Sequence, residues 1–495
     1  MNYSYKHSAM QLSLEEQIEH IGSLADSSPV KFIKLLEQHF DIQEFIPSAF
    51  YEKYYASQTN DRDIALESML KILLLAHFFK FDIYENFVTL LCFASDIRNF
   101  CQLKLNQLPT ASAISKFKSA FDAEIHGLFN QISLYVVDLF AVYDDSLPDG
   151  DPSKGLAETG IYDTSGVKPK VKENNPKFTA TEVRKQENYK KFLDRKGQGA
   201  GFNVYAAAYA SLPKFSEANP DVRLDYVNGH FGYFYKFGMI ANGFGVPLNI
   251  HFFDKQFYDS MPSGFDSMEE QKYSYDNASL GPVFASFIGR VGHNPFNTFL
   301  GDSEFDSYDN YGFLNRAGFS RVLIPINPRN ANLDNAVDFP INGEGVPCCP
   351  VDGVPFVADG SCKGRNRSFR LKYVCPRSVK ANGKWACACE NKCRKTNSTV
   401  TKYTYPAGDL RVFSGVQRGS EEWDGLYKTR TVIERSLSSL KSHPALDKPN
   451  TYNCATLRSD ICLAAITKLA TVILAFATGN FACMRNIKKL LIECA

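Results

Sequence analysis

The sequence lacks a long uninterrupted apolar run, which a membrane-spanning helix needs. Its most apolar stretch, residues 461–477, is shorter than a bilayer span and carries Lys468 near its middle. The opening segment, Met-Asn-Tyr-Ser-Tyr-Lys-His-Ser, has no apolar stretch after its cation, so it is not typical of a secretory signal. We therefore predict a cytoplasmic protein in which residues 461–477 form a buried helix.

Internal repeats, low-complexity tracts and a strong net charge are also missing. The formal net charge is +1 over 495 residues, and 44% hydrophobic with 22% charged residues is typical of a soluble globular protein of two or three domains. This small net charge conceals an uneven distribution of positive and negative residues along the chain. Residues 363–395 hold eleven Lys or Arg and one acid, and residues 165–200 hold ten against four. Such basic stretches predict a polyanionic partner.

The pattern of apolar and turn-forming residues divides the chain into regions of three kinds. Residues 1–150 have apolar side chains at helical spacing and predict a helical N-terminal domain. Residues 155–329 and 410–495 alternate strand and helix patterns, which predicts an α/β domain. Between its two parts, residues 330–409 predict a β-rich insertion that is both basic and rich in cysteine.

One N-terminal helix could read DNA. It follows Pro109, and Thr110 or Ser112 can supply its capping oxygen. Its apolar residues share one face, away from two lysines: Ile114, Phe117 and Phe121 against Lys116 and Lys118. Nothing marks these lysines as base readers, so an ordinary packing helix is the favoured interpretation.

Two aspartates are expected at strand ends. Residues 160–166 predict a short strand that ends in a carboxylate, Asp163. Asp302 directly follows the apolar stretch 297–301, although Asp306 and Asp309 are local rivals. Because Asp-Thr-Ser-Gly is also good turn chemistry, Asp163 has a purely structural alternative. Between these strands, Asn242-Gly243 predicts a hairpin.

Four reactive side chains share one stripe of a helix predicted over residues 427–441. At 100° per residue they fall within an arc of about 60°, and they are Tyr427, Arg430, Glu434 and Lys441. An apolar stripe lies beside them, made by Leu426, Ile433, Leu437 and Leu440. A solvated surface face is the alternative interpretation. The presence of Asp163 and Asp302 as partners for Glu434 favours a phosphate and metal site instead.

Three carboxylates suit phosphodiester chemistry. Two divalent cations held close together can activate an oxygen nucleophile and stabilise the leaving oxygen. Hard cations such as Mg²⁺ or Mn²⁺ prefer oxygen ligands, which Asp163, Asp302 and Glu434 would supply. Such distant residues can meet only if their strands are neighbours in the sheet.

With these residues, the chain resembles the DDE transposases of bacterial insertion sequences, in the branch with a Tyr-Arg-Glu-Lys signature and a β-rich insertion before the catalytic Glu. The resemblance implies a ribonuclease H-like mixed sheet flanked by helices, and an N-terminal domain that binds DNA ends. It implies that Asp163, Asp302 and Glu434 are catalytic and bind two ions, while Tyr427, Arg430 and Lys441 contact DNA. It also implies a nucleoid-associated homodimer that acts on terminal inverted repeats and target DNA.

The insertion carries further candidates. Its basic residues predict contacts with the DNA backbone, namely Arg365, Arg367, Arg370 and Lys372. Seven cysteines could supply a structural Zn²⁺ site: Cys348, Cys349, Cys362, Cys375, Cys387, Cys389 and Cys393. Their spacing is not that of a standard zinc finger, so reduced, partly buried thiols are the favoured interpretation.

Two other functions remain open at the level of sequence. The same fold could serve a DNA nuclease that performs no strand transfer. Alternatively, the basic insertion, with or without zinc, could belong to a non-catalytic DNA-binding protein. The complete set of Asp163, Asp302 and Glu434 favours an enzyme over the latter.

Overall fold

The structure is a computed structural model of the whole chain, and it divides into two compact units. It describes residues 28–56, 63–227, 230–260, 268–327, 340–342, 345–364, 367–381, 384–391, 393, 400–405, 410–411 and 414–493. Unit 1 comprises residues 1–131 and 466–495, and unit 2 comprises residues 132–465. In this division the chain after residue 465 groups with the N-terminal helices, and the insertion groups with the sheet.

Unit 1 is built from helices around aromatic side chains. Phe50, Tyr54, Phe117 and Phe121 are buried together, with Phe117 and Phe121 ring centroids 4.9 Å apart. The elements wholly within this unit are α2 (Ser28–His39), η1 (Ile42–Phe45), α3 (Ser48–Tyr55), α4 (Leu66–Phe78), α5 (Tyr84–Phe93), α6 (Ser95–Phe100), η2 (Leu105–Gln107), α7 (Ala111–Ala120), η6 (Phe481–Cys483) and α18 (Ile487–Glu493).

Helix α7 is the candidate DNA-reading helix of the sequence. Thr110 caps it by accepting a hydrogen bond from the Ala113 amide at 3.1 Å. Lys118 is 3% exposed, and its ammonium lies 4.8 Å from the centre of the Tyr84 ring. A buried lysine cannot reach a base edge, which supports the packing interpretation for this side chain.

Two long helices, α8 (Asp122–Ser146) and α17 (Cys454–Ala477), each begin in one unit and end in the other. By length and composition both could cross a membrane, but 78% of the apolar window of α17 and 44% of that of α8 are buried within the structure. The buried helix predicted over residues 461–477 is therefore confirmed. Burial also lowers the pKa of Lys468 to about 8.

The centre of unit 2 is a mixed six-stranded sheet, which confirms the predicted α/β class. Its strands are β1 (Thr159–Val167), β2 (Arg223–Val227), β3 (His230–Asn242), β4 (Pro247–Phe253), β5 (Thr298–Leu300) and β6 (Arg321–Leu323). The antiparallel strands β1–β4 form one side, with β3 paired to β1, β2 and β4. Strand β5 lies parallel to both β1 and β6. The predicted hairpin at Asn242-Gly243 joins β3 to β4.

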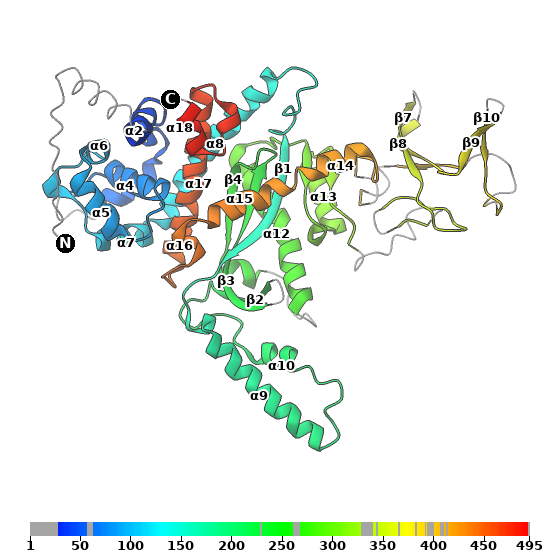
Figure 1. The fold of residues 1–495 in the computed structure, drawn as a ribbon, viewed down its shortest axis with the longest axis horizontal. Helices are drawn as coiled ribbons and strands as arrows, with labels where there is room; N and C mark the ends of the chain where they lie inside the picture. The colour runs from blue at the N-terminus through cyan, green and yellow to red at the C-terminus, as the bar shows by residue number, and fades with distance from the viewer. Residues whose placement is uncertain are drawn as a thin grey trace, which may run out of the picture. The chain divides into compact units, whose positions relative to one another are not determined.

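Helices cover this sheet and extend from it (Figure 1). Because successive strand residues point to opposite faces, Tyr162 meets α12, where its hydroxyl lies 2.7 Å from that of Ser279, while Asp163 points to the face on which α15 runs across β1. The helices are η3 (Lys172–Asn174), α9 (Pro176–Arg195), α10 (Val204–Ser211), α11 (Lys255–Asp259), α12 (Met268–Val291), η4 (Ser303–Phe305), α13 (Tyr308–Arg316), α14 (Glu421–Lys428), α15 (Thr431–Lys441) and α16 (Pro444–Asp447).

The insertion is β-rich where the structure describes it. Its strands are β7 (Val357–Gly364), β8 (Arg367–Val374), β9 (Ser378–Ala381), β10 (Lys384–Cys387) and β11 (Thr401–Thr404). They form a three-stranded sheet, in the order β11-β8-β7, and a β9–β10 hairpin. A small core holds the insertion together, with Phe356, Leu371 and Tyr373 buried in it.

Candidate functional site

Asp163 lies within β1 rather than at its end. The parallel pairing of β1 with β5 stops at Ile161 opposite Leu300, but antiparallel pairing with β3 continues to Val167. The prediction that the strand ends at Asp163 was therefore wrong. The reason is that the long strand β3 supports the polar residues that follow. Asp163 lies just past the last parallel pair, and its Oδ1 accepts a hydrogen bond from the Thr164 amide at 2.8 Å.

Asp302 follows β5 after a single residue, as predicted. Its Oδ1 accepts a hydrogen bond from the Glu304 amide at 2.9 Å, which caps the short helix η4. This bond fixes the side chain beside the end of β5. Since β5 is the parallel neighbour of β1, Asp302 is brought close to Asp163.

The single helix predicted over residues 427–441 is two helices. Helix α14 ends at Lys428 and α15 begins at Thr431. Between them, the amides of Thr429 and Arg430 bond the carbonyls three residues earlier, as in a tight 3₁₀ turn. The predicted apolar stripe is nevertheless buried at Ile433, Leu437 and Leu440.

The three carboxylates converge on the guanidinium of Arg430. Its Nη2 lies 3.3 Å from Asp302 Oδ2 and 4.0 Å from Asp163 Oδ2. Its Nη1 lies 2.7 Å from Glu434 Oε1. Both aspartate Oδ2 atoms lie near the same nitrogen, Nη2, so the distance between these two oxygens is at most about 7 Å. Three segments that are remote in sequence therefore meet at one cation.

Burial and, after it, the crowding of like charges determine the electrostatics of this cluster. Burial raises the pKa of the Asp163 carboxyl to about 7, and the neighbouring charge of Asp302 adds to the rise while Arg430 opposes it. Burial opposes the charge of Arg430, but Asp302 and its neighbours raise the pKa of the guanidinium. The acids are thus held together at an electrostatic cost that added positive charge would relieve.

Tyr427 and Lys441 border the same cluster. The Tyr427 hydroxyl donates to the Gly301 carbonyl at 3.3 Å, and its ring stacks on Trp423 with centroids 6.4 Å apart. Burial lowers the pKa of Lys441, and the charge of Asp163 partly offsets this effect. Lys441 is thus close enough to Asp163 for the two charges to interact, and Tyr427 contacts the residue before Asp302.

The chemistry of the donors suits divalent cations, because three carboxylates offer hard oxygen ligands. In the structure, however, the acids surround Arg430. Within the described residues, no group of three His, Cys, Asp or Glu side chains is arranged so that it could hold a metal ion. Glu434 is 54% exposed and Asp302 27% exposed, so solvent can reach both carboxylates. The residues fit such ions if Arg430 gives up its ion pairs.

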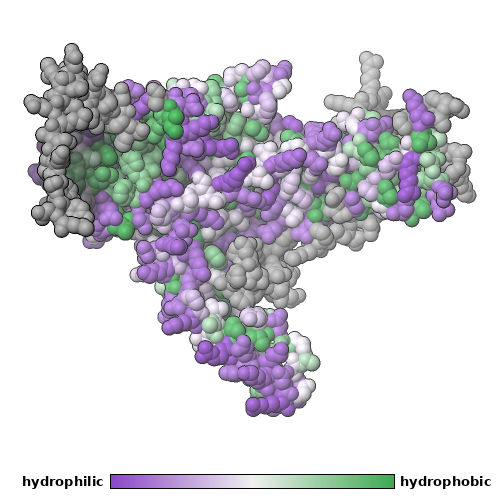
Figure 2. Space-filling view, viewed as in Figure 1, coloured by the Kyte–Doolittle hydropathy of each residue, from purple (hydrophilic) through white to green (hydrophobic). Residues whose placement is uncertain are grey.

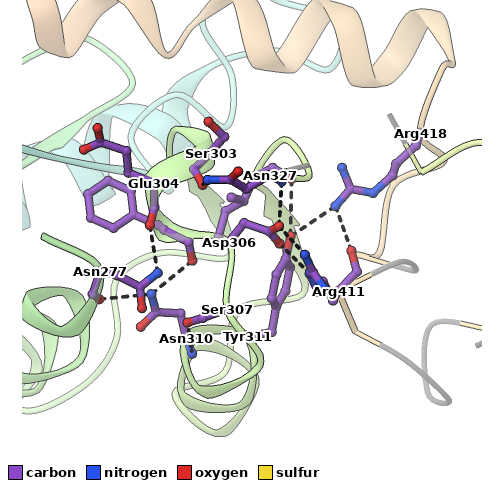
Figure 3. A network of polar contacts seen from close by, with 12 residues as sticks. Asn277, Ser303, Glu304, Asp306, Ser307, Asn310, Tyr311, Asn327, Arg411 and Arg418 are labelled. Carbon is purple, nitrogen blue, oxygen red and sulfur yellow. Dashed lines mark hydrogen bonds and ion pairs between the residues drawn. The ribbon is translucent and has the colours of Figure 1, made fainter. Parts of the chain in front are cut away.

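The rival Asp306 has a structural role (Figure 3). It is fully buried, and its carboxylate accepts two hydrogen bonds from Arg411, at 2.9 and 2.7 Å. It also accepts a bond from the Asn327 amide at 2.7 Å. With both oxygens engaged inside the protein, Asp306 has no capacity left for a substrate or ion. Asp309 is exposed in the first turn of α13.

Arg411 and Arg418 were missed by sequence reasoning. Arg418 Nη2 donates to the Arg411 carbonyl at 2.8 Å and to the Tyr311 hydroxyl at 3.1 Å. Both arginines are at most 2% exposed. A basic residue after a basic insertion looks like a surface residue, and no local pattern signals that its partner lies about a hundred positions earlier.

The structure gives partners to two of the basic candidates in the insertion. The Arg370 guanidinium lies 3.9 Å from the centre of the Tyr403 ring, and Lys372 pairs with Asp359. Arg365 and the side chain of Arg367 lie outside the described residues. For Arg370 and Lys372, the contacts with described residues lie within the insertion rather than at the carboxylate cluster.

Several cysteines belong to the small core of the insertion. Cys349 and Cys375 are buried in it, and Cys393 packs against it. Burial raises the pKa of the Cys393 thiol, and Cys349 and Cys375 lie close enough for their charges to raise it further.

The comparisons with known proteins address the N-terminal region. Residues 22–120 match a family model described as Transposase domain (DUF772). The match supports a transposase role in general, and with it DNA binding. It covers less than half of the chain and includes none of the three carboxylates. No curated protein and no solved structure matches the chain.

Proposed function

We propose that this protein is a DDE transposase that cuts and rejoins DNA at the ends of its own element. The observation that carries the proposal is the meeting of Asp163, Asp302 and Glu434 at one guanidinium. The strand order β4-β3-β1-β5-β6, with β1 and β5 parallel, supports a ribonuclease H-like catalytic fold. The match of residues 22–120 to a transposase domain supports the same class independently.

The three carboxylates would hold two Mg²⁺ or Mn²⁺ ions. Such ions activate water or a 3′-hydroxyl for attack on a phosphodiester and stabilise the leaving oxygen. The protein's own task is to present these oxygens from three rigid segments. Asp163 comes from the middle of a sheet strand, Asp302 from a capped turn, and Glu434 from a helix packed on the sheet.

The cationic and aromatic residues would bind the DNA around the scissile phosphate. Arg430 can exchange carboxylates for phosphate oxygens, because its planar fork matches both groups. Lys441 would supply a second positive charge to the phosphates. Tyr427, already stacked on Trp423, offers an aromatic face on which a displaced base can stack. A homodimer would allow two element ends to be processed together.

Substituting Asp302→Asn tests the proposal. The amide keeps the shape and its neutral oxygen can still accept the Glu304 bond, but the negative charge that a divalent ion requires is lost. We expect nicking of a duplex that carries the element end, measured with Mg²⁺, to fall by at least about 10³-fold. Affinity for the duplex should change little. Asp309→Asn, in the exposed first turn of α13, is the matched control and should leave nicking unchanged.

The outcomes separate the candidate functions. Nicking that survives Asp302→Asn contradicts the proposed metal site. Nicking by the unaltered protein without joining of a supplied 3′-hydroxyl to target DNA indicates a nuclease. Binding of DNA without any nicking indicates a non-catalytic DNA-binding protein.

A further inference from the structure

A basic groove lies in unit 2 outside the carboxylate cluster. It has a volume of about 700 Å³ and is lined by residues 168–172, 174–176 and 447–450. Its walls are joined through the main chain, because the Lys170 amide donates to the Thr451 carbonyl at 2.9 Å. The Asn219 side chain also donates to the Tyr452 carbonyl at 2.9 Å. The Lys170–Thr451 bond thus ties the two lining segments to each other.

The charge of this groove is one-sided. Four lysines line it against one acid, Asp447. Lys172 pairs with Glu217. The other three, Lys168, Lys170 and Lys448, are exposed and form no ion pair with any residue that the structure describes.

The side chains between these lysines anchor the walls. Pro169, Val171 and Pro449 are buried, so the lysines that alternate with them face outward. On the face shown in Figure 2, hydrophilic side chains dominate the region where the chain leaves the sheet for α9. Like charges brought together without partners stabilise no fold, since they repel one another. Their arrangement suits an anion with several regularly spaced charges.

Both walls of the groove are continuous with the carboxylate cluster. One wall is reached along β1, since Lys168 follows five residues after Asp163. An extended strand advances about 3.3 Å per residue, so Lys168 lies roughly 16 Å from Asp163. The other wall is reached from α15, which carries Glu434 and Lys441 and leads through α16 to Lys448. Two of the three segments that carry acids therefore run into the groove.

We infer that this groove binds the phosphate backbone of duplex DNA about five base pairs from the phosphate that is cut, given a spacing of 3.4 Å per base pair along the helix axis. The inference rests on the proposed function for which phosphate is cut. The lysines contact phosphates without reading sequence. They hold the flanking duplex in register, so that the scissile phosphate reaches the carboxylates.

A triple variant tests this inference: Lys168→Ala, Lys170→Ala and Lys448→Ala. Affinity for an element-end duplex is measured by fluorescence anisotropy over a series of salt concentrations. Each phosphate contact contributes about 0.9 to the slope of log affinity against log salt, so the slope should become shallower by about 2.7. At low salt and saturating DNA the variant should still nick, because its carboxylates are untouched.

The matched control removes the same charge from lysines of unit 2 that already have carboxylate partners. They are Lys154, Lys185 and Lys255, paired with Asp149, Glu182 and Asp259. Because a paired lysine displaces fewer counterions from DNA, the control should keep a slope close to that of the unaltered protein. Equal slopes in the two triple variants would show that the effect is general loss of charge, and would overturn the inference.

A shortened duplex locates the contact. When the flank on the groove side ends fewer than five base pairs from the cut, the triple variant and the unaltered protein should bind it equally. A persistent difference on the short duplex places the lysines elsewhere and overturns the inference. The two proposals can fail separately. If the triple variant keeps the salt slope of the unaltered protein while nicking depends on Asp302, only the groove proposal is refuted. If its slope becomes shallower but neither protein nicks DNA, only the transposase proposal is refuted.

Discussion

Unit 2 contains two clusters of polar residues that are centred on arginines. Their acids Asp302 and Asp306 are only four residues apart in the sequence. The Arg430 cluster consists of Asp163, Asp302, Arg430 and Glu434. The Arg411 cluster consists of Asp306, Tyr311, Asn327, Arg411 and Arg418. In the first, Asp302 is 27% and Glu434 54% exposed. In the second, Asp306 is 0% and Arg411 2% exposed.

The difference indicates that burial and the number of hydrogen bonds determine whether an Asp–Arg pair stabilises the fold or can exchange its partners. Asp306 and Arg411 form a two-bond fork away from water, so breaking it leaves a buried charge uncompensated. Arg430 instead divides its fork among three acids, and its Nε has no hydrogen-bond partner among the described residues. The buried Asp306–Arg411 pair therefore stabilises the fold, whereas the ion pairs of Arg430 can be exchanged for other partners.

Arg411→Met should have the largest effect on stability. It removes the guanidinium but keeps much of the volume, and leaves the Asp306 carboxylate buried without its charge partner. The free energy of unfolding, measured by urea denaturation, should fall by about 3–5 kcal/mol. The double variant Arg411→Met with Asp306→Leu should recover part of this loss. If the free energy of unfolding falls by less than about 1 kcal/mol in the single variant, the Asp306–Arg411 pair does not stabilise the fold as proposed.

The same substitution in the other cluster, Arg430→Met, should lower the free energy of unfolding by less than Arg411→Met does, because Asp302 and Glu434 are 27% and 54% exposed and only Asp163 is left largely buried. The affinity for Mg²⁺, measured by calorimetry, should instead rise about fivefold, since no ion pairs need to be given up. Nicking should fall, because a phosphate contact is lost. Weaker binding of Mg²⁺ in the variant would contradict a competition between Arg430 and the ion.

Local sequence patterns predicted the parts of the site that depend on local structure. Asp302 follows an apolar run and is found one residue after the end of a strand. Glu434 adjoins an apolar helical stripe, and Ile433, Leu437 and Leu440 are buried as that spacing requires. The Asn242-Gly243 hairpin follows from turn chemistry. In each case neighbours along the chain determine the outcome.

Features that depend on distant segments were not predictable. Strand β1 runs past Asp163 because β3 pairs with it as far as Val167. The tight turn before Thr431 leaves no mark in a helical wheel, because both sides of the break keep helical spacing. Arg411 finds its partner through tertiary contact, and α17 continues into unit 1 without any local stop signal.

Two tyrosines allow the smallest comparison. The hydroxyls of Tyr311 and Tyr427 each donate to a main-chain carbonyl at 3.3 Å, those of Ile324 and Gly301. The Tyr311 hydroxyl also accepts a bond from Arg418 at 3.1 Å. Replacement by Phe removes only the hydroxyl in both cases. Tyr311→Phe should lower the free energy of unfolding by about 1–3 kcal/mol, since a buried cation loses an acceptor.

Tyr427→Phe should cost less than Tyr311→Phe in the same denaturation assay, about 0.5–1.5 kcal/mol, because it removes one hydrogen bond and leaves no buried cation without an acceptor. Its ring and its stacking on Trp423 are kept, so affinity for an element-end duplex should also be nearly unchanged. Tyr427→Ala, which removes the ring, should weaken DNA binding by about 1–3 kcal/mol if a base stacks there. Equal losses of unfolding free energy in the two Phe variants would contradict the comparison. They would mean that burial does not make the Arg411 cluster more important for stability than the Arg430 cluster.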